Sequence, residues 1–156
     1  MKTVSRIAPI ALRIALGLMF TGAGITGLLQ LAAPPPLTGA AGSFMGGLAA
    51  AGYFFPLLKS VELVAGLLLL SGRMVPLALT LLAPIVVNIA AFHFLLAPQG
   101  GAMAALIVLL EVALVWLHRD AFAPLFRPAP ASARASEEPT SIVGGLGSEV
   151  GQARSA

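Results

Sequence analysis

Four long apolar segments determine what this chain of 156 residues can fold into. They run from about residue 7 to 31, 53 to 71, 75 to 97 and 102 to 118. At about 1.5 Å per helical residue, each is long enough, or nearly so, to cross a hydrocarbon layer roughly 30 Å thick. The sequence therefore predicts an all-α integral membrane protein in which residues 1–127 form a bundle of four transmembrane helices.

The composition excludes an ordinary soluble domain. Hydrophobic residues make up 58% of the chain and charged residues only 10%, whereas soluble domains carry about 25% charged residues. The basic residues are scattered, with no basic face interleaved with aromatic residues, so we expect no nucleic-acid partner. The absence of cysteine excludes disulfides, Cys-ligated iron–sulfur clusters and dithiol exchange.

Proline and glycine mark the connections between the segments. Pro34–Pro36 must stop the first helix, 98–101 separates the third from the fourth, and Pro84 should kink the third. Between residues 37 and 52 the chain is apolar, glycine-rich and uncharged, which predicts a short re-entrant or interfacial helix around 43–51. Residues 128–156 are rich in Ala, Pro, Ser, Gly and Glu, which predicts a disordered tail.

The basic residues outside the segments all fall on one side of the proposed membrane. They lie before the first segment, between the second and third, and after the fourth, and they include Lys2, Arg6, Arg73, Arg119, Arg127 and Arg134. The other two connections carry none. Because Lys and Arg concentrate in cytoplasmic loops, we expect both termini, and the tail, to be cytoplasmic.

Four charged residues lie inside the segments, namely Arg13, Lys59, Glu62 and Glu111, and their charges sum to zero. One charge at the bilayer centre costs about 2.5–3.5 kcal/mol or more, so we expect these residues to pair with one another. Lys59 and Glu62 are three residues apart and share a helix face, although Lys59 has the alternative of reaching the outer interface. Arg13 and Glu111 lie at similar depths in the cytoplasmic half, which favours a pair between them. Snorkelling of Arg13 to the headgroups is the alternative.

Two uncharged polar residues complete the candidate site. Asn88 lies near the depth of Lys59 and Glu62, and His93 lies nearer the outer face. Asn88 is expected to form an interhelical hydrogen bond, and His93 is the residue that titrates closest to neutral pH. We therefore expect an inward-facing polar network across the four helices, which binds a ligand, relays protons or is purely structural.

The same residues argue against a metal or haem site. His93 and His118 lie near opposite membrane faces and cannot share one iron, and no paired Glu-x-x-His motif is present. We expect no metal site and identify no cofactor from the residues alone.

The chain resembles the DoxX family of small four-helix bacterial membrane proteins over roughly residues 6–127. The motifs that carry the resemblance are Arg13-x-x-x-Gly17-Leu18-x-Phe20-x-x-Ala23-Gly24, Lys59-x-x-Glu62-Leu63-x-x-Gly66-Leu67-Leu68-Leu69, the pair Asn88 and His93, and Glu111. The resemblance implies a location in the bacterial cytoplasmic membrane. Relatives named DoxD and DoxA are linked to thiosulfate:quinone oxidoreduction, and others to membrane redox complexes.

The resemblance implies an accessory subunit of a membrane redox system, whose polar core binds a quinone-like or other small ligand or relays protons. Its partners are then the lipid bilayer and an oxidoreductase protein. The sequence favours no enzyme activity for the chain on its own, and it leaves open whether the chain forms a homo-oligomer. Two alternatives stay open: a transporter or permeation path for a small solute, and a structural partner without chemistry.

Overall fold

The computed structural model describes residues 4–32 and 36–127, all of whose regular structure is helical. The chain divides into two units, residues 1–123 and 124–156, and the helices that matter here belong to the first. The elements are α1 (Val4–Leu28), α2 (Gly39–Ala50), α3 (Phe54–Ser71), α4 (Val75–Leu95), η1 (Pro98–Gly100), α5 (Gly101–Leu117), α6 (Arg119–Phe122) and η2 (Ala123–Phe126). The expected disordered tail, 128–156, lies outside the described residues.

The four expected spans are confirmed as helices long and apolar enough to cross a membrane: α1, α3, α4, and α5 extended by η1. The first ends at Leu28, a few residues earlier than expected, because a backbone motif stops it before the prolines. The N–H of Leu31 donates to the carbonyl of Thr26 (3.0 Å), and Gln30 adopts a left-handed conformation (φ 52°). This is a Schellman-type ending with glutamine where glycine is usual.

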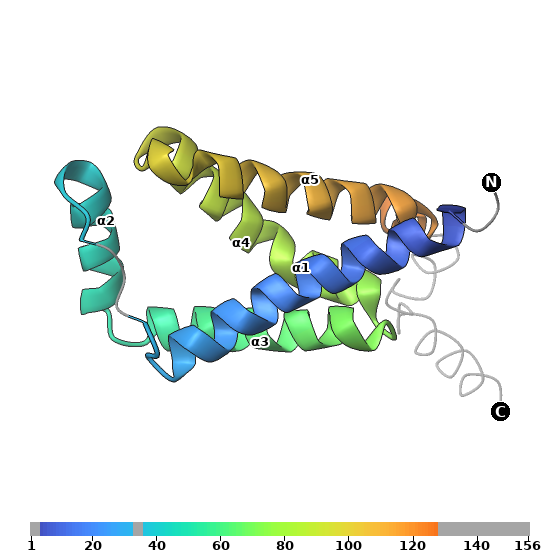
Figure 1. The fold of residues 1–156 in the computed structure, drawn as a ribbon, viewed down its shortest axis with the longest axis horizontal. Helices are drawn as coiled ribbons and strands as arrows, with labels where there is room; N and C mark the ends of the chain where they lie inside the picture. Colours follow the sequence, from blue (N-terminus) through green and yellow to red (C-terminus); the bar gives the residue numbers. More distant parts are fainter. Residues whose placement is uncertain (1–3, 33–35, 128–156) are drawn as a thin grey trace, which may run out of the picture. The chain divides into compact units, whose positions relative to one another are not determined.

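The four long helices form a ring in which α1 packs on α3, α3 on α4, α4 on α5, and α5 on α1 (Figure 1). A core of buried apolar side chains fills its centre, including Leu16, Phe20, Leu69, Leu82 and Leu114. One end, which carries Arg73 and Arg119, we call the basic end. The other, formed by α2 and η1, we call the far end.

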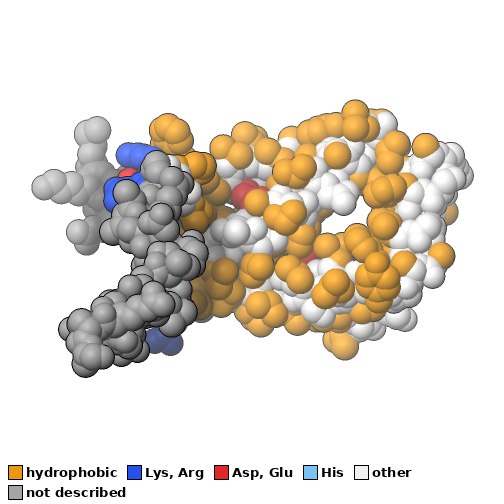
Figure 2. Space-filling model, turned by 180° about the vertical axis from the view of Figure 1, so that it is seen from behind, with side chains coloured by type: hydrophobic (Ala, Val, Ile, Leu, Met, Phe, Trp, Pro, Cys, Tyr) orange, Lys and Arg blue, Asp and Glu red, His pale blue; other side chains and the backbone are white. Residues whose placement is uncertain are grey.

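The outer surface of the helices is apolar, as a lipid environment requires. Large side chains are exposed along the length of every long helix, for example Leu18, Leu67, Val87 and Leu109, and apolar side chains dominate the face in Figure 2. A helix that is hydrophobic all round belongs in a protein core or a membrane. The chain is therefore a multi-pass membrane protein.

Helices α1 and α3 pack closely against each other, and glycines permit it. A Cβ atom added to Gly24 would lie 2.8 Å from the Cα and N atoms of Leu63, and one added to Gly66 would lie 2.6 Å from the N atom of Thr21. The obstacles are backbone atoms, which cannot rotate away. Small residues let membrane helices approach closely enough for van der Waals packing to hold them together.

Gly24→Ala is therefore expected to destabilise the bundle by about 1–3 kcal/mol, because it overpacks a rigid contact. Gly22→Ala is the matched control in the same helix, since a Cβ there would meet nothing within 4 Å, and it should be neutral or slightly stabilising. Unfolding in a graded series of denaturing detergent measures both. Equal effects of the two substitutions would contradict the close α1–α3 contact.

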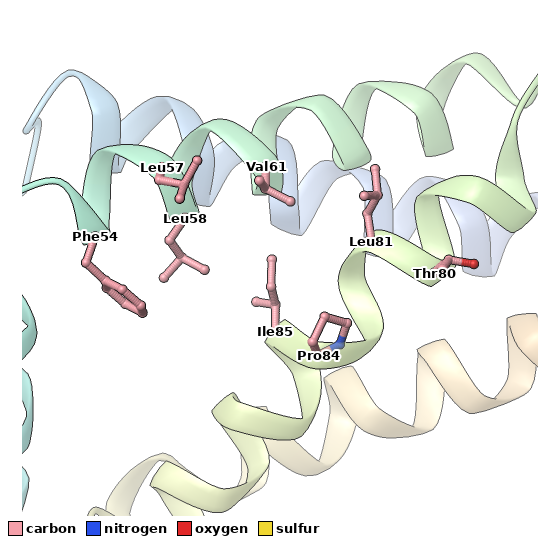
Figure 3. A pocket seen from close by; sticks show the side chains of 8 residues that line it. All are labelled: Phe54, Leu57, Leu58, Val61, Thr80, Leu81, Pro84 and Ile85. Carbon is pink, nitrogen blue, oxygen red and sulfur yellow. The ribbon is translucent and has the colours of Figure 1, made fainter.

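Helix α4 runs without a break through Pro84, and its ribbon changes direction where Pro84 lies (Figure 3). A proline removes one backbone hydrogen bond and its ring crowds the preceding turn, which bends a helix. The short helix expected between the first two spans is present as α2, which begins four residues earlier than expected. Its position relative to the membrane stays a prediction.

Candidate functional site

A cavity of about 1110 Å³ lies in the far half of the first unit. Its walls come from four helices and from the turn that follows α1, and a hollow is visible in the corresponding part of Figure 2. The polar residues that line it are Thr26, Gln30, Lys59, Glu62, Asn88 and His93. The cavity therefore brings together four of the six site residues expected from the sequence.

Lys59 and Glu62 form an ion pair on α3, as their spacing predicted. The Lys59 Nζ atom lies 2.7 Å from Glu62 Oε2. The Glu62 side chain is 4% exposed, whereas that of Lys59 is 25% exposed. The carboxylate thus depends on the lysine for its stability, while the lysine keeps access to the cavity. The pair adds polarity to the wall without adding net charge.

Asn88 lies one turn beyond Pro84 on α4 and its side chain is exposed in the cavity wall. The interhelical hydrogen bond expected for it is not formed among the described residues, where no side-chain hydrogen bond of Asn88 is found. The cavity itself is the physical reason, because the space opposite Asn88 is open. Its amide offers two donors and one acceptor to a molecule in that space.

His93 stands one to two turns further along α4 and is held in place by its surroundings. Its Nδ1 atom donates to the carbonyl of Ala97 (3.2 Å), since a carbonyl only accepts. The ring packs edge-on against Phe92 and lies against Gly100, where any side chain would collide with it. In the neutral ring this arrangement leaves Nε2 as a hydrogen-bond acceptor.

Helix α2 closes part of the cavity. Its Phe44 ring lies 5.8 Å from the Phe92 ring of α4, centroid to centroid, and Met45 and Leu48 join Phe44 in the lining. The helix is built largely from glycine and alanine, so these three larger side chains carry its contact with the cavity. The short glycine-rich segment is therefore part of the site.

The pair expected between Arg13 and Glu111 is absent: the structure forms no ion pair between them, and neither side chain lines the cavity. The Arg13 guanidinium lies instead against Gly72, the residue that ends α3. The carbonyl groups at a helix C-terminus carry partial negative charge and attract cations, so this position favours the guanidinium charge without Glu111, although the Arg13 Nε atom has no hydrogen-bond partner among the described residues. Gly72 leaves room for it, with a left-handed backbone (φ 69°).

Glu111 is buried on α5, with 5% of its surface exposed. Neither of its carboxylate oxygens has a hydrogen-bond partner among the described residues. It shares a helix face with Ala104, Ile107 and Leu114, which belong to or pack near the apolar core. The single network expected across four helices is therefore wrong: there is a polar cavity in one half and a separate buried carboxylate.

Sequence reasoning missed two polar residues of the lining, Thr26 and Gln30. Gln30 did carry a signal, because it interrupts an apolar run of about 25 residues. The structure adds an indication that the sequence does not carry: Gln30 has a left-handed backbone, and such conformations in residues other than glycine cluster at functional sites. The aromatic residues of the lining gave no such signal, as aromatic residues are common at membrane interfaces.

Within the ranges 4–32 and 36–127, no group of three or more His, Asp or Glu side chains lies close enough to hold a metal ion. No known protein family, curated protein or solved structure matches the chain. The geometry and chemistry of the cavity are therefore what indicates the function of the chain.

Proposed function

We propose that this chain binds a small ligand with an uncharged, quinone-like head in the far-half cavity, as a DoxX-like accessory subunit of a membrane redox system. The observation that carries the proposal is the cavity lined by Lys59, Glu62, Asn88 and His93 within an otherwise apolar bundle. Polar side chains within a membrane are costly and mark functional sites. At about 1110 Å³, the cavity is slightly larger than the roughly 300–1,000 Å³ typical of ligand pockets.

The chemistry of the lining favours an uncharged head. Lys59 and Glu62 neutralise each other at 2.7 Å, so the wall attracts neither anions nor cations strongly. Asn88 both donates and accepts, and neutral His93 accepts at Nε2. A quinone needs donors for its two carbonyl oxygens, whereas a hydroquinone needs acceptors for its hydroxyl hydrogens. Asn88 and the Lys59–Glu62 pair supply both kinds of group.

The same residues offer a short proton path. Oxidation of a hydroquinone releases two electrons and two protons, and in this proposal a partner oxidoreductase takes up the electrons. Glu62 and His93 lie in the cavity wall, and the Glu62 carboxylate and the Nε2 atom of neutral His93 are the groups that accept the protons. Glu111 is no part of this path, because it does not line the cavity. We propose the bacterial cytoplasmic membrane as the location, with the basic end facing the cytoplasm.

Binding of a short-chain benzoquinone to the purified protein in lipid nanodiscs tests the proposal. A ligand that binds only the folded state raises the unfolding temperature as its concentration rises. We expect this shift for the wild type, and we expect Asn88→Leu to weaken binding about tenfold because a polar contact to the head is lost.

Val87→Leu is the matched control for Asn88→Leu, since Val87 is the neighbouring residue and its side chain is 68% exposed on the apolar surface. It should bind like the wild type. No shift for the wild type at saturating benzoquinone would contradict a quinone-like head.

The alternative of a permeation path has less support. The apolar core, with Leu16, Leu69 and Leu114 fully buried, fills the bundle between the cavity and the basic end. Flux of small solutes in sealed vesicles that contain the protein would favour the transporter, and neither flux nor ligand binding would favour the structural partner.

A further inference from the structure

A second, apolar hollow lies in the seam between α3 and α4 (Figure 3). It has a volume of about 360 Å³. Its lining residues are Phe54, Leu57, Leu58, Val61, Thr80, Leu81, Pro84 and Ile85. We call it the α3–α4 groove. The Thr80 hydroxyl donates to the carbonyl of Pro76 (2.9 Å), so even the one polar side chain of the lining has its hydrogen bond within its own helix.

The groove and the cavity share one wall. Phe54 and Leu58 of α3 and Pro84 and Ile85 of α4 line both hollows. The bend of α4 at Pro84 lies at this shared wall (Figure 3). Asn88 follows Pro84 by one turn on the cavity side, so the polar residues begin where the apolar groove ends.

The groove lies within the apolar length of the bundle. Its residues on α4 are five to ten positions past Val75, about 8–15 Å from the basic end along the helix, and its residues on α3 are ten to seventeen positions before Ser71, about 15–26 Å from that end. Both ranges fall within a hydrocarbon layer roughly 30 Å thick. Leu57, which lines the groove, is 59% exposed, and the lining comes from α3 and α4 alone. The groove is therefore open to the acyl chains of a surrounding bilayer.

We propose that the ligand is a membrane amphiphile with an uncharged hydrogen-bonding head and one long apolar tail, which enters from the bilayer through the α3–α4 groove. Its head lies in the cavity beside Asn88, and its tail stays in the groove against Leu57, Val61 and Leu81. This inference rests on the proposed function and adds to it the class of ligand and its route. An apolar slot in the seam between two helices fits one apolar tail and offers no free hydrogen-bonding side chain to a polar one.

Two probes that share one benzoquinone head test this inference: one with a short chain and one with a long isoprenoid tail, compared at equal mole fraction in the nanodisc lipid. Thr80 lines the groove but not the cavity, so Thr80→Trp fills the groove from outside the cavity. We expect it to weaken binding of the long-tailed probe about tenfold, through lost packing contacts along the tail, and to leave the short-chain probe within about twofold.

Leu77→Trp is the matched control, because Leu77 is exposed on α4 outside the groove, and it should change neither affinity. A photoreactive group on the tail provides a readout in the wild type, where crosslinks should fall on residues 57–61 and 80–85. If the short-chain probe fails to bind the wild type, the proposed function fails. If it binds but the crosslinks fall elsewhere, or Thr80→Trp weakens both probes equally, only the lateral route is overturned.

Discussion

Lys59→Met is expected to lower the free energy of unfolding by about 3 kcal/mol, because breaking a buried ion pair leaves an uncompensated charge. The charge left behind is the Glu62 carboxylate, whose side chain is 4% exposed and whose ion-pair partner is Lys59 at 2.7 Å. No other ion pair is present among the described residues to replace it. Unfolding in graded denaturing detergent, with the wild type alongside, measures the loss.

Glu62→Gln provides the comparison that makes this result specific. It leaves Lys59 without its partner, but the lysine is 25% exposed in the cavity wall and keeps its access to polar surroundings. We expect a loss of only about 1 kcal/mol, and we expect the double variant to resemble Glu62→Gln rather than the sum of the two. Additive effects in this cycle would show that the two side chains do not depend on each other.

Glu111→Met is expected to act in the opposite direction and to stabilise the protein by about 1–3 kcal/mol, because a buried polar group without a partner is costly. Both carboxylate oxygens of Glu111 lack a partner among the described residues, and the residue is 5% exposed. Methionine has a similar length and is apolar throughout, so it should fit between Ile107 and Leu114 without a cavity.

Glu111→Gln separates polarity from shape, since it keeps a polar group of the same size in the same place. Glu111→Gln should raise the free energy of unfolding much less than Glu111→Met does in the same measurement. A loss of stability in Glu111→Met would mean that the carboxylate has a partner in the folded protein, and the separation of Glu111 from the other polar residues would then be wrong. A stabilised variant that loses function would instead identify Glu111 as a residue kept for its chemistry.

The spans were predictable because their signal is local. A run of about 20 apolar residues is long enough by itself to indicate a span, and the connections that contain proline or glycine separate one run from the next. The end of α1 was less predictable, because the prolines at 34–36 gave an obvious stop while the hydrogen bond from Leu31 to Thr26 already ends the helix. A Schellman-type ending without glycine leaves little trace in the sequence.

The pairing of the buried charges was predictable only within one helix. The three-residue spacing of Lys59 and Glu62 fixes their common face, and the ion pair follows. Depth along the membrane placed Arg13 and Glu111 at one level, but it carries no information on the direction in which each side chain points. Arg13 also had a competing partner, the C-terminus of α3 at Gly72, which a list of charged residues does not contain.

The cavity was not predictable from residue types. Its polar residues were identified from the sequence, but its space depends on how the bundle is arranged: on the bend at Pro84 and on the contact of Phe44 with Phe92. The bend follows from Pro84 itself and was predictable, but the contact of Phe44 with Phe92 joins segments far apart in the chain. The sequence therefore indicated most of the polar side chains that line the cavity, but not how they are arranged around it.

The central claim, that the far-half cavity holds one amphiphilic ligand, is tested most directly by mass spectrometry of the small molecules bound to protein purified from its own membranes. We predict about one tailed, uncharged molecule per chain in the wild type. Ala23→Phe should lose this molecule, because the phenylalanine ring would occupy part of the cavity that Ala23 lines. Ile25→Phe should keep the molecule, because Ile25 is exposed and does not line the cavity. A wild type that carries only bulk lipid, in the same amount as Ala23→Phe, would contradict the account.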